Sequence, residues 1–355
     1  QLLDVPAIVA FDHNLGGGAT EYLIEKRKLA LKEGKRFLTV RFDIDNMRYY
    51  LEYEYKKYKI QYFAKDLDMI LDEIPRVDEI WINELVTYQE IYQVLDQILA
   101  LKEKHQAHLK MLLHDFFFMC PAVNLMIDQG KSCNQCIPAN RSNACLDYES
   151  GTAWRTHWRE FLSRCDEILA FSDDTAQLFK KTYPYLCQLH VLPHKPHYVT
   201  ALDKKAKTTK TLNIGLLGVL CYKKGLDVVK EMVKEIEAQN LNIRMKLIGV
   251  SDEEIDSPVF SCTGRYTRDE LPRLTMEEDI DLFFIPSIWP ETFSYTTSEI
   301  MFMHMPVAVF PIGAPVERVK YYEKGLVLKE TDAKSALKEL QEFAEHTLHC
   351  QEMPV

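Results

Sequence analysis

Residues 281–303 read DLFFIPSIWPETFSYTTSEIMFM. The apolar run Asp281–Ile285 has the length of a buried strand, and Tyr295–Met303 has the length and spacing of a helix. The loop between them carries Glu291, and Glu299 lies about two turns beyond that loop inside the helix. Parallel α/β sheets are assembled from such strand, loop and helix units, so this stretch predicts an α/β fold.

The first half of the chain repeats the same alternation of apolar runs and amphipathic stretches. The predicted strands are Ala7–Phe11, Phe37–Phe42, Glu79–Ile82, Leu109–Leu113, Ile168–Phe171 and His190–Leu192. The predicted helices are Thr20–Glu33, Leu67–Ile74, Tyr88–His105, Ala153–Cys165 and Asp174–Lys181. Tyr49–Phe63 alternates aromatic and charged residues, which favours an additional hairpin. This half predicts one Rossmann-like domain.

The second half starts the pattern again after a polar segment. Residues 200–211, TALDKKAKTTKT, are rich in Lys and Thr and are typical of a linker. The strands expected beyond it are Leu212–Leu217, Arg244–Ile248, Val259–Cys262, Asp281–Ile285, Val307–Phe310 and Gly325–Leu328. The helices are Gly225–Ala238, Arg268–Met276, Tyr295–Met303, Val316–Tyr322 and Ala333–Thr347. This half predicts a second Rossmann-like domain.

The domain organisation follows from these two blocks. We expect a first Rossmann-like domain over residues 1–199, a linker over 200–211, a second Rossmann-like domain over 212–332, and a C-terminal helical segment over 333–355 that could pack back on the first domain. Open α/β sheets bind ligands beyond the carboxyl ends of their strands. Two such domains are therefore expected to face each other across a ligand-binding cleft.

Composition excludes several classes of protein. The chain has 355 residues, of which 47% are hydrophobic and 27% charged, as expected for folded globular domains. A formal net charge of -10 argues against a protein that grips nucleic acid over a broad surface. No apolar stretch reaches the roughly 20 residues of a membrane-spanning helix. The chain opens on Gln1 without a signal-peptide pattern, so further domains of a longer polypeptide stay open.

The cysteines favour a reducing compartment. Nine cysteines, an odd number, are scattered through a chain large enough to fold without disulfides, which predicts a cytoplasmic protein. Four of them, Cys120, Cys133, Cys136 and Cys145, fall within 26 residues and contain one C-x2-C pair. They could close a structural zinc site, but the spacing is not that of a common zinc finger, and free thiols are the alternative that we favour. We expect no metal and no cofactor.

The chemistry of residues 285–299 depends on two carboxylates. Glu291 lies next to Thr292, Phe293 and Ser294, whose backbone amides would stand at a helix N-terminus and could meet a phosphate. One carboxylate could then accept hydrogen bonds from sugar hydroxyls, while Glu299 accepts them from a ribose. The alternative is an acidic helix start followed by a solvated glutamate, and the spacing alone does not choose between the two.

The wider segment resembles the signature of the retaining, nucleotide-sugar-dependent glycosyltransferases of family four, the "group 1" family with the GT-B fold. The residues that match are Pro290, Glu291, Phe293, Glu299, Pro306, Val307 and Gly313. The SYTTSE and GAPVER variants look most like the branch that builds bacterial surface polysaccharides such as O-antigens. The fold that this resemblance implies is GT-B, with two Rossmann-like domains facing across a cleft.

Three further segments resemble the same family. Gly16, Gly17 and Gly18 follow the first strand, as in the Gly-rich acceptor or phosphate loop of the family, although a plain tight turn is the alternative. His114 ends a strand where the family places a histidine near the reacting sugar. Lys224 matches the Lys of the family's diphosphate-binding Lys-Gly pair.

One position departs from the pattern. Many members carry an Arg six residues before that Lys, where this chain has Gly218. Either Lys223 or helix N-terminal amides would then have to replace the missing cation. Because of this departure, a catalytically silent protein with the same fold is an alternative. His304 stands where a Gly is common, which affects only local packing.

The resemblance implies transfer of a sugar from a nucleotide diphosphate donor to a growing glycan, with retention and without a metal. The implied catalytic residues are His114 and Glu291, and the implied donor contacts are Gly218, Lys223, Lys224, Thr292, Phe293, Ser294 and Glu299. We expect a UDP- or dTDP-linked donor, a glycan or lipid-linked glycan acceptor, and no nucleic acid partner. A nucleotide-sugar 2-epimerase and a silent binding module are the alternatives.

A basic stretch near the N-terminus leaves membrane contact open. The predicted helix Thr20–Glu33 and the residues after it carry Lys26, Arg27, Lys28, Lys32, Lys35 and Arg36. Such a face could dock on anionic lipid, as an enzyme with a lipid-linked acceptor would need at the inner membrane face. A solvated helix face held by ion pairs is the plainer interpretation.

Overall fold

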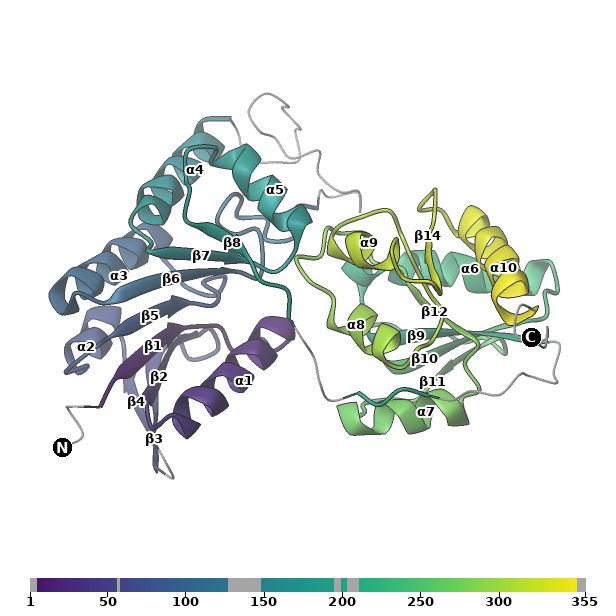
Figure 1. The fold of residues 1–355 in the computed structure, drawn as a ribbon, viewed down its shortest axis with the longest axis horizontal. Helices are drawn as coiled ribbons and strands as arrows, with labels where there is room; N and C mark the ends of the chain where they lie inside the picture. Colours follow the sequence, from purple (N-terminus) through teal and green to yellow (C-terminus); the bar gives the residue numbers. More distant parts are fainter. Residues whose placement is uncertain (1–4, 56–57, 127–147, 195–198, 203–210, 350–355) are drawn as a thin grey trace. The chain divides into compact units, whose positions relative to one another are not determined.

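The computed structural model describes residues 5–55, 58–126, 148–194, 199–202 and 211–349. These residues form two compact units (Figure 1). The first holds the described residues up to Leu125 and from 148 to Pro193, and the second holds those from His194 onward together with Met126. Each unit contains its own sheet, so each is a separate α/β domain.

The sheet of the first unit has the strand order β4-β3-β2-β1-β5-β6-β7-β8. Its strands are β1 (Ala7–Phe11), β2 (Arg36–Asp43), β3 (Arg48–Tyr55), β4 (Tyr58–Ala64), β5 (Glu79–Ile82), β6 (His108–Leu113), β7 (Glu167–Ala170) and β8 (Leu189–Val191). All pairs are parallel except β2 with β3 and β3 with β4, which are antiparallel. The predicted hairpin is therefore confirmed as the edge of a parallel sheet.

The helices of this unit alternate with the parallel strands. They are α1 (Gly18–Lys32), α2 (Leu67–Asp72), α3 (Ile91–His105), α4 (Tyr148–Ser163) and α5 (Asp173–Thr182). Helix α1 buries Leu23 and Ala30 against Ile8 and Ala10 of β1, which alternate with side chains of the opposite face. This arrangement is the doubly wound pattern that the alternation of the sequence predicts.

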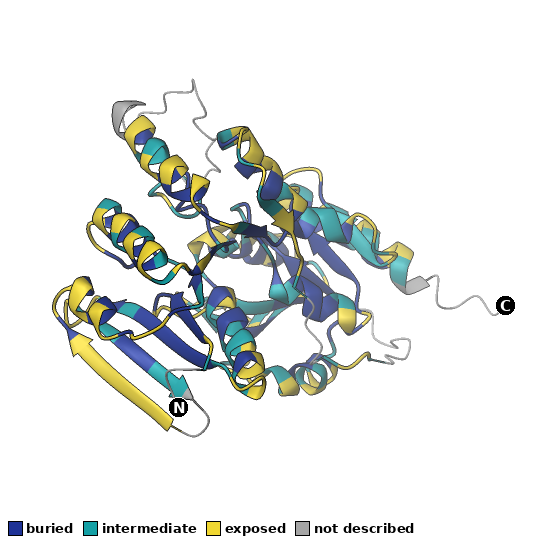
Figure 2. Cartoon of the chain, turned by 60° about the vertical axis from the view of Figure 1, so that its left-hand side comes forward, coloured by how far each residue is buried: buried dark blue, intermediate teal, exposed yellow. Residues whose placement is uncertain are grey.

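Strand β4 is the exposed margin of the sheet. Its first six residues are exposed and only Ala64 is buried, because no further strand pairs with it in the described part of the unit (Figure 2). Strand β3 behind it is held to α1 by an ion pair between Arg27 and Glu52, whose atoms Nη1 and Oε1 lie 2.9 Å apart. Strand β3 still contributes Tyr49 and Leu51 to the buried hydrophobic residues, whereas β4 contributes only Ala64.

The second unit forms a parallel sheet with the strand order β11-β10-β9-β12-β13-β14. Its strands are β9 (Leu212–Leu220), β10 (Ile243–Ser251), β11 (Phe260–Cys262), β12 (Leu282–Ile285), β13 (Val307–Val309) and β14 (Gly325–Val327). Its helices are α6 (Leu226–Ala238), α7 (Leu271–Glu277), α8 (Tyr295–Phe302), α9 (Ala314–Val319) and α10 (Ala333–His349), with 3-10 turns at Tyr222–Lys224 (η1) and Arg268–Glu270 (η2).

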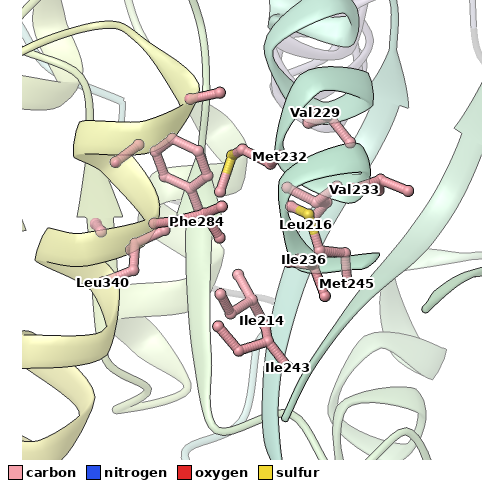
Figure 3. Close-up of a cluster of buried hydrophobic side chains, with 14 of the residues drawn as sticks. Ile214, Leu216, Val229, Met232, Val233, Ile236, Ile243, Met245, Phe284 and Leu340 are labelled. Carbon is pink, nitrogen blue, oxygen red and sulfur yellow. The ribbon is translucent and has the colours of Figure 1, made fainter. Parts of the chain in front are cut away.

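Two cores cover the two faces of this second sheet. Phe284 of β12 packs in the core formed with α6 and α10, which Figure 3 shows around Met232 and Leu340. Its neighbour Phe283 packs in the other core, with Ile300 of α8. Adjacent residues of a strand point to opposite faces, so the continuous apolar run of β12 is explained by helices on both sides.

The C-terminal helix α10 belongs to the core of the second unit. Ala336, Leu337, Leu340 and Ala344 lie in the same buried cluster as α6. Its apolar face is therefore covered within this domain, and burial of that face does not require a return to the first domain.

The basic stretch near α1 is divided among ion pairs and buried contacts. Besides the pair of Arg27 with Glu52, Lys35 lies 3.6 Å from a carboxylate oxygen of Glu79. Arg36 is buried and its Nε donates to the carbonyl of Val5. The stretch therefore does not present all its charges on one open face, which favours the plainer interpretation of a helix face held by ion pairs.

The expectations about a metal site and a membrane-spanning helix can be compared only with the described residues. Cys120 is half-buried, whereas Cys133, Cys136 and Cys145 lie outside the described residues. Among the side chains that are described, no group of three His, Cys, Asp or Glu residues is arranged to hold a metal ion. No helix in the described parts of the chain is long and apolar enough to cross a membrane.

Candidate donor site

Two loops of the second unit meet at the point where its strand order reverses. Strand β9 pairs with β10 on one side and with β12 on the other. Residues 221–225 follow β9 and residues 286–294 follow β12, so both loops leave the same edge of the sheet. The two connections run in opposite directions, which makes this position the switch point of the sheet. Parallel sheets bind their ligands at this place.

Gly225 brings these two loops into contact. Its φ of +82° is in the left-handed region, and a Cβ built there would lie 2.1 Å from the carbonyl oxygen of Pro286. The amide of Ile288 donates to the carbonyl of Lys223 at 3.1 Å. Only glycine allows the backbone at position 225 to pack so closely on Pro286. The Lys224-Gly225 pair therefore fixes the position of the Lys224 backbone next to the second loop.

Lys224 and Glu291 form an ion pair between the two loops. Lys224 Nζ lies 2.6 Å from Glu291 Oε1, and Glu291 is 2% exposed. The ammonium groups of Lys224 and of Lys223 also lie near the ring of Trp289, at 5.8 and 5.1 Å from its centroid. One buried carboxylate and two cations are thus gathered at the switch point.

Helix α8 begins directly behind this pair. Ser294 is its N-cap, and the Ser294 side chain accepts a hydrogen bond from the amide of Thr297. The N-terminus of a helix carries a partial positive charge that attracts anions. Gly218 of β9 lies beside this helix, since a Cβ built on it would be 3.5 Å from Cγ2 of Thr296.

Gly218 is part of the sheet rather than of the loop. Strand β9 stays paired with β10 up to Leu220, three residues past the predicted end of the strand, and Gly218 is opposite Gly249. A Cβ on Gly249 would lie 1.8 Å from the carbonyl oxygen of Gly218. Gly218 stands at the position where many members of the family that the sequence resembles carry Arg, and in this chain it is packed closely against Gly249.

Glu299 lies one turn further along α8 and is buried. Its Oε1 is 3.6 Å from Nε of Arg268, and the Arg268 guanidinium lies 5.4 Å from the ring centroid of Tyr295. Burial, with the charge of Glu299, raises the pKa of Tyr266 well above its usual range. Arg268 partly offsets that effect. The negative charge of Glu299, in helix α8, is thus compensated by Arg268.

The loop that carries Glu291 is held from behind by α9. The amide of Ala314 donates to the carbonyl of Glu291 at 2.9 Å, and Gly313 packs directly on Pro290. Arg318 hydrogen-bonds Ser298 and lies 5.1 Å from the ring centroid of Phe293. Burial lowers the pKa of Arg318, while the nearby charge of Glu317 opposes this shift. These contacts fix the backbone of residues 290–294.

His194 adds an aromatic contact to the same loop. Its ring is edge-on to Phe293, with centroids 4.5 Å apart, and stacked on Tyr295, with centroids 5.1 Å apart. His194, the residue at which the chain re-enters the second unit, is therefore packed on the N-terminus of α8.

In the first unit, the predicted glycine loop and His114 lie at the carboxyl ends of β1 and β6. Gly16 and Gly17 have φ of +80° and +95° and open surroundings, and Gly18 begins α1. The His114 ring is stacked on Phe171 at 4.4 Å and edge-on to Tyr22 at 5.1 Å. Aromatic packing thus orients His114 at this sheet edge.

A buried polar cluster occupies the same edge of the first sheet. Asp12 is fully buried, accepts a hydrogen bond from Asn83 at 2.8 Å, and lies 3.0 Å from Nη2 of Arg41. His13 pairs with Glu84. Burial alone would lower the pKa of His13, but the hydrogen bond and charge of Glu84 raise it. Asp12 and His13 were not among the predicted site residues.

The structure therefore brings together most of the predicted donor residues. The residues that lie on β9, its following loop or the β12–α8 connection are Gly218, Lys223, Lys224, Glu291, Thr292, Phe293 and Ser294, and Glu299 lies within α8 itself. Arg268, Trp289 and Arg318 were not among the predicted residues. Trp289 is adjacent to the motif and could have been included. Arg318 ends the GAPVER stretch, although no role was predicted for it, whereas Arg268 is distant in sequence and no motif marked it.

One family model and several solved structures are similar to this chain. Residues 200–353 match the family model of the group 1 glycosyl transferases. No curated protein sequence matches the chain. Among solved structures, Anabaena HepE in complex with UDP is 13% identical with a TM-score of 0.62, covering 97% of this chain and 91% of that one. Sucrose-phosphate synthase from Thermosynechococcus elongatus is 12% identical with a TM-score of 0.66, covering 96% and 90%.

A third similar structure is the catalytic domain of starch synthase IV from Arabidopsis thaliana bound to ADP and acarbose, which is 11% identical with a TM-score of 0.59 and covers 96% of this chain and 92% of that one. The chain accordingly has the GT-B fold, an α/β architecture of two Rossmann-like domains. The match to the family model of the group 1 glycosyl transferases, over residues 200–353, lies on the second unit.

Proposed function

We propose that this protein transfers a sugar from a nucleotide diphosphate donor to a hydroxyl of a growing glycan, with retention at the anomeric carbon and without a metal. The observation that carries the proposal is the Lys224–Glu291 pair, at 2.6 Å, at the switch point of a group 1 glycosyltransferase domain. HepE and starch synthase IV, solved with UDP and with ADP, share the fold and support a nucleotide donor.

In this proposal the second unit stabilises the leaving group. The bond between the anomeric carbon and the diphosphate breaks, the acceptor oxygen bonds to that carbon, and the hydroxyl proton leaves with the diphosphate. Lys224, Lys223 and the N-terminus of α8 stabilise the charge that develops on the diphosphate. These groups take the role of the Arg that many family members carry at the position of Gly218.

The two glutamates have different roles. Glu291, buried against Lys224, orients the transferred sugar through its hydroxyls, and Glu299 accepts hydrogen bonds from the ribose. Gly218 lies beside Thr296 and leaves room for the diphosphate, because it has no side chain. Thr292, Phe293 and Ser294 provide the backbone of the phosphate-binding turn.

On the resemblance to the family, we assign His114 to the transferred sugar and Gly16, Gly17 and Gly18 to the acceptor. The acceptor class is a polysaccharide or lipid-linked glycan of the O-antigen type, and the reaction is placed in the cytoplasm, with peripheral contact at the inner membrane face for a lipid-linked acceptor.

A thermal-shift screen tests the proposal. The full chain is heated with UDP, dTDP, GDP or ADP, each with and without EDTA. We expect one nucleotide to raise the Tm, with unchanged effect in EDTA, since a ligand at about 100 times its Kd adds about 2.7 kcal/mol of stability. Lys224→Met should lose most of this shift, whereas Lys338→Met, on the exposed side of α10, should keep it.

Two results would contradict the proposal. Absence of a shift with every nucleotide would make the chain a silent member of the fold. Conversion of the donor to an epimeric nucleotide sugar without an acceptor, detected by product analysis, would make it an epimerase.

A further inference from the structure

The carboxylate of Glu299 is compensated by a cation of the chain itself. Its side chain is 4% exposed, and Nε of Arg268 lies 3.6 Å from its Oε1. Arg268 in turn lies over the Tyr295 ring, one helical turn before Glu299.

The local backbone fixes the position of Arg268. Thr267 and Glu270 form a capping box, in which the Thr267 amide donates to Glu270 Oε2 at 2.9 Å. Arg268 is the first residue of the η2 turn that this box begins. Its guanidinium is therefore directed at Glu299 by an ordered turn rather than by a free loop.

Compensation changes what a carboxylate requires from a ligand. A buried carboxylate that accepts hydrogen bonds from both ribose hydroxyls loses one of these bonds when the ligand lacks the 2′-hydroxyl. Because the buried acceptor then stays unsatisfied, such a site binds the deoxy analogue much more weakly. An arginine beside the carboxylate supplies charge and N–H donors of its own. Loss of one ligand hydroxyl then costs much less.

We propose that Arg268 is a specificity-determining residue that makes the donor site accept 2′-deoxyribonucleoside diphosphates nearly as well as ribonucleoside diphosphates. The inference rests on the proposed function, because it takes Glu299 as the ribose-binding carboxylate. It goes further in naming the class of nucleotide: thymidine donors, which have no 2′-hydroxyl, are admitted by the same contact that admits uridine donors.

The test compares two ligands that differ only in the 2′-hydroxyl. Dissociation constants of UDP and 2′-deoxy-UDP are measured by calorimetry on the full chain, or those of the matching pair for whichever base the thermal-shift screen selects. We expect the two constants of the wild-type chain to agree within about fivefold. In Arg268→Met, which keeps the apolar stem, the preference for the ribonucleotide should rise to at least about tenfold.

Two variants serve as controls. Arg268→Lys keeps a cation and should retain a ratio near that of the wild type. Arg244→Met removes an exposed arginine from β10, where Arg244 Nη1 donates to the carbonyl of Pro258 at 3.1 Å, and should leave the ratio unchanged.

Several outcomes would overturn the inference. A wild-type preference for UDP above about 30-fold would show that the site requires the 2′-hydroxyl. An unchanged ratio in Arg268→Met would show that Arg268 does not set it. Loss of both nucleotides in that variant alone would make Arg268 a ligand anchor. Failure of the wild type to bind any nucleoside diphosphate would instead contradict the proposed function.

Discussion

At the scale of single residues, the donor site is organised by opposite charges with unequal exposure. Glu291 has 3% of its side chain exposed, whereas Lys224 has 32%. A buried carboxylate that loses its cation cannot regain full hydration, while a partly exposed ammonium that loses its carboxylate can. The two halves of the pair therefore contribute differently to stability.

This asymmetry predicts the order of three variants. Lys224→Met should lower the free energy of unfolding by about 1 to 3 kcal/mol, less than the cost of breaking a fully buried pair because Lys224 is one-third exposed. Glu291→Gln should cost less than Lys224→Met, and Lys223→Met should cost less than about 1 kcal/mol. Urea unfolding at pH 7 measures all three. A larger loss in Glu291→Gln than in Lys224→Met would contradict this account of the pair.

At the scale of elements, the hairpin β3–β4 is attached to the first unit through charge as well as through pairing. Glu52 of β3 lies 2.9 Å from Arg27 of α1 and 3.0 Å from Lys59 of β4. Burial alone would raise the pKa of Glu52, but the hydrogen bond and charge of Lys59, with further help from Arg41, lower it. A carboxylate thus ties an exposed edge strand to a helix.

The lowered pKa of Glu52 predicts a pH dependence. Its contribution to stability is fully present above its ordinary pKa of 4.5 and is lost as the pH falls through the lower value of the folded state. Glu52→Gln should therefore destabilise the chain by about 1 to 2 kcal/mol at pH 7, and the difference from wild type should shrink below about pH 4.5. Chemical denaturation at several pH values measures this difference.

Glu54→Gln is the matched control for that measurement. Glu54 is on the same strand and also contacts Arg27, at 3.2 Å, but its side chain is 24% exposed against 8% for Glu52. We expect a smaller loss in this variant. A pH-independent difference between Glu52→Gln and wild type would refute the role given to the Glu52 charge.

At the scale of the whole molecule, each unit buries its own apolar residues. The second unit has a six-stranded parallel sheet among its described residues, with separate cores on its two faces. Helix α10 closes one of these cores against α6. A domain with this organisation satisfies the requirements for independent folding.

We therefore expect a chain of residues 194–355 to fold without the first unit. Its urea unfolding, followed by circular dichroism, should be a single cooperative transition. Removing α10 as well should abolish that transition, because Leu337 and Leu340 would no longer cover the α6 face of the core. A gradual, non-cooperative loss of signal from residues 194–355 would show that the first unit is needed for folding.

Much of this architecture follows from local sequence patterns. Strand β1 has the predicted bounds, and the predicted hairpin and the helices between parallel strands are present, because period and run length report which face an element buries. The end of β9 was predicted too early, at Leu217. Gly218 there reads as a loop residue, but pairing with Gly249 continues the strand to Leu220.

The sequence by itself determined the α/β pattern, the Lys224-Gly225 turn and the loop that carries Glu291, since each depends on residues close together in the chain. Only the tertiary structure decided that Lys224 pairs with Glu291 and that Arg268 compensates Glu299. Those partners are 67 and 31 residues apart, and which side chains meet is set by strand order and by the direction in which each loop leaves the sheet. Spacing along the chain carries no information about that choice.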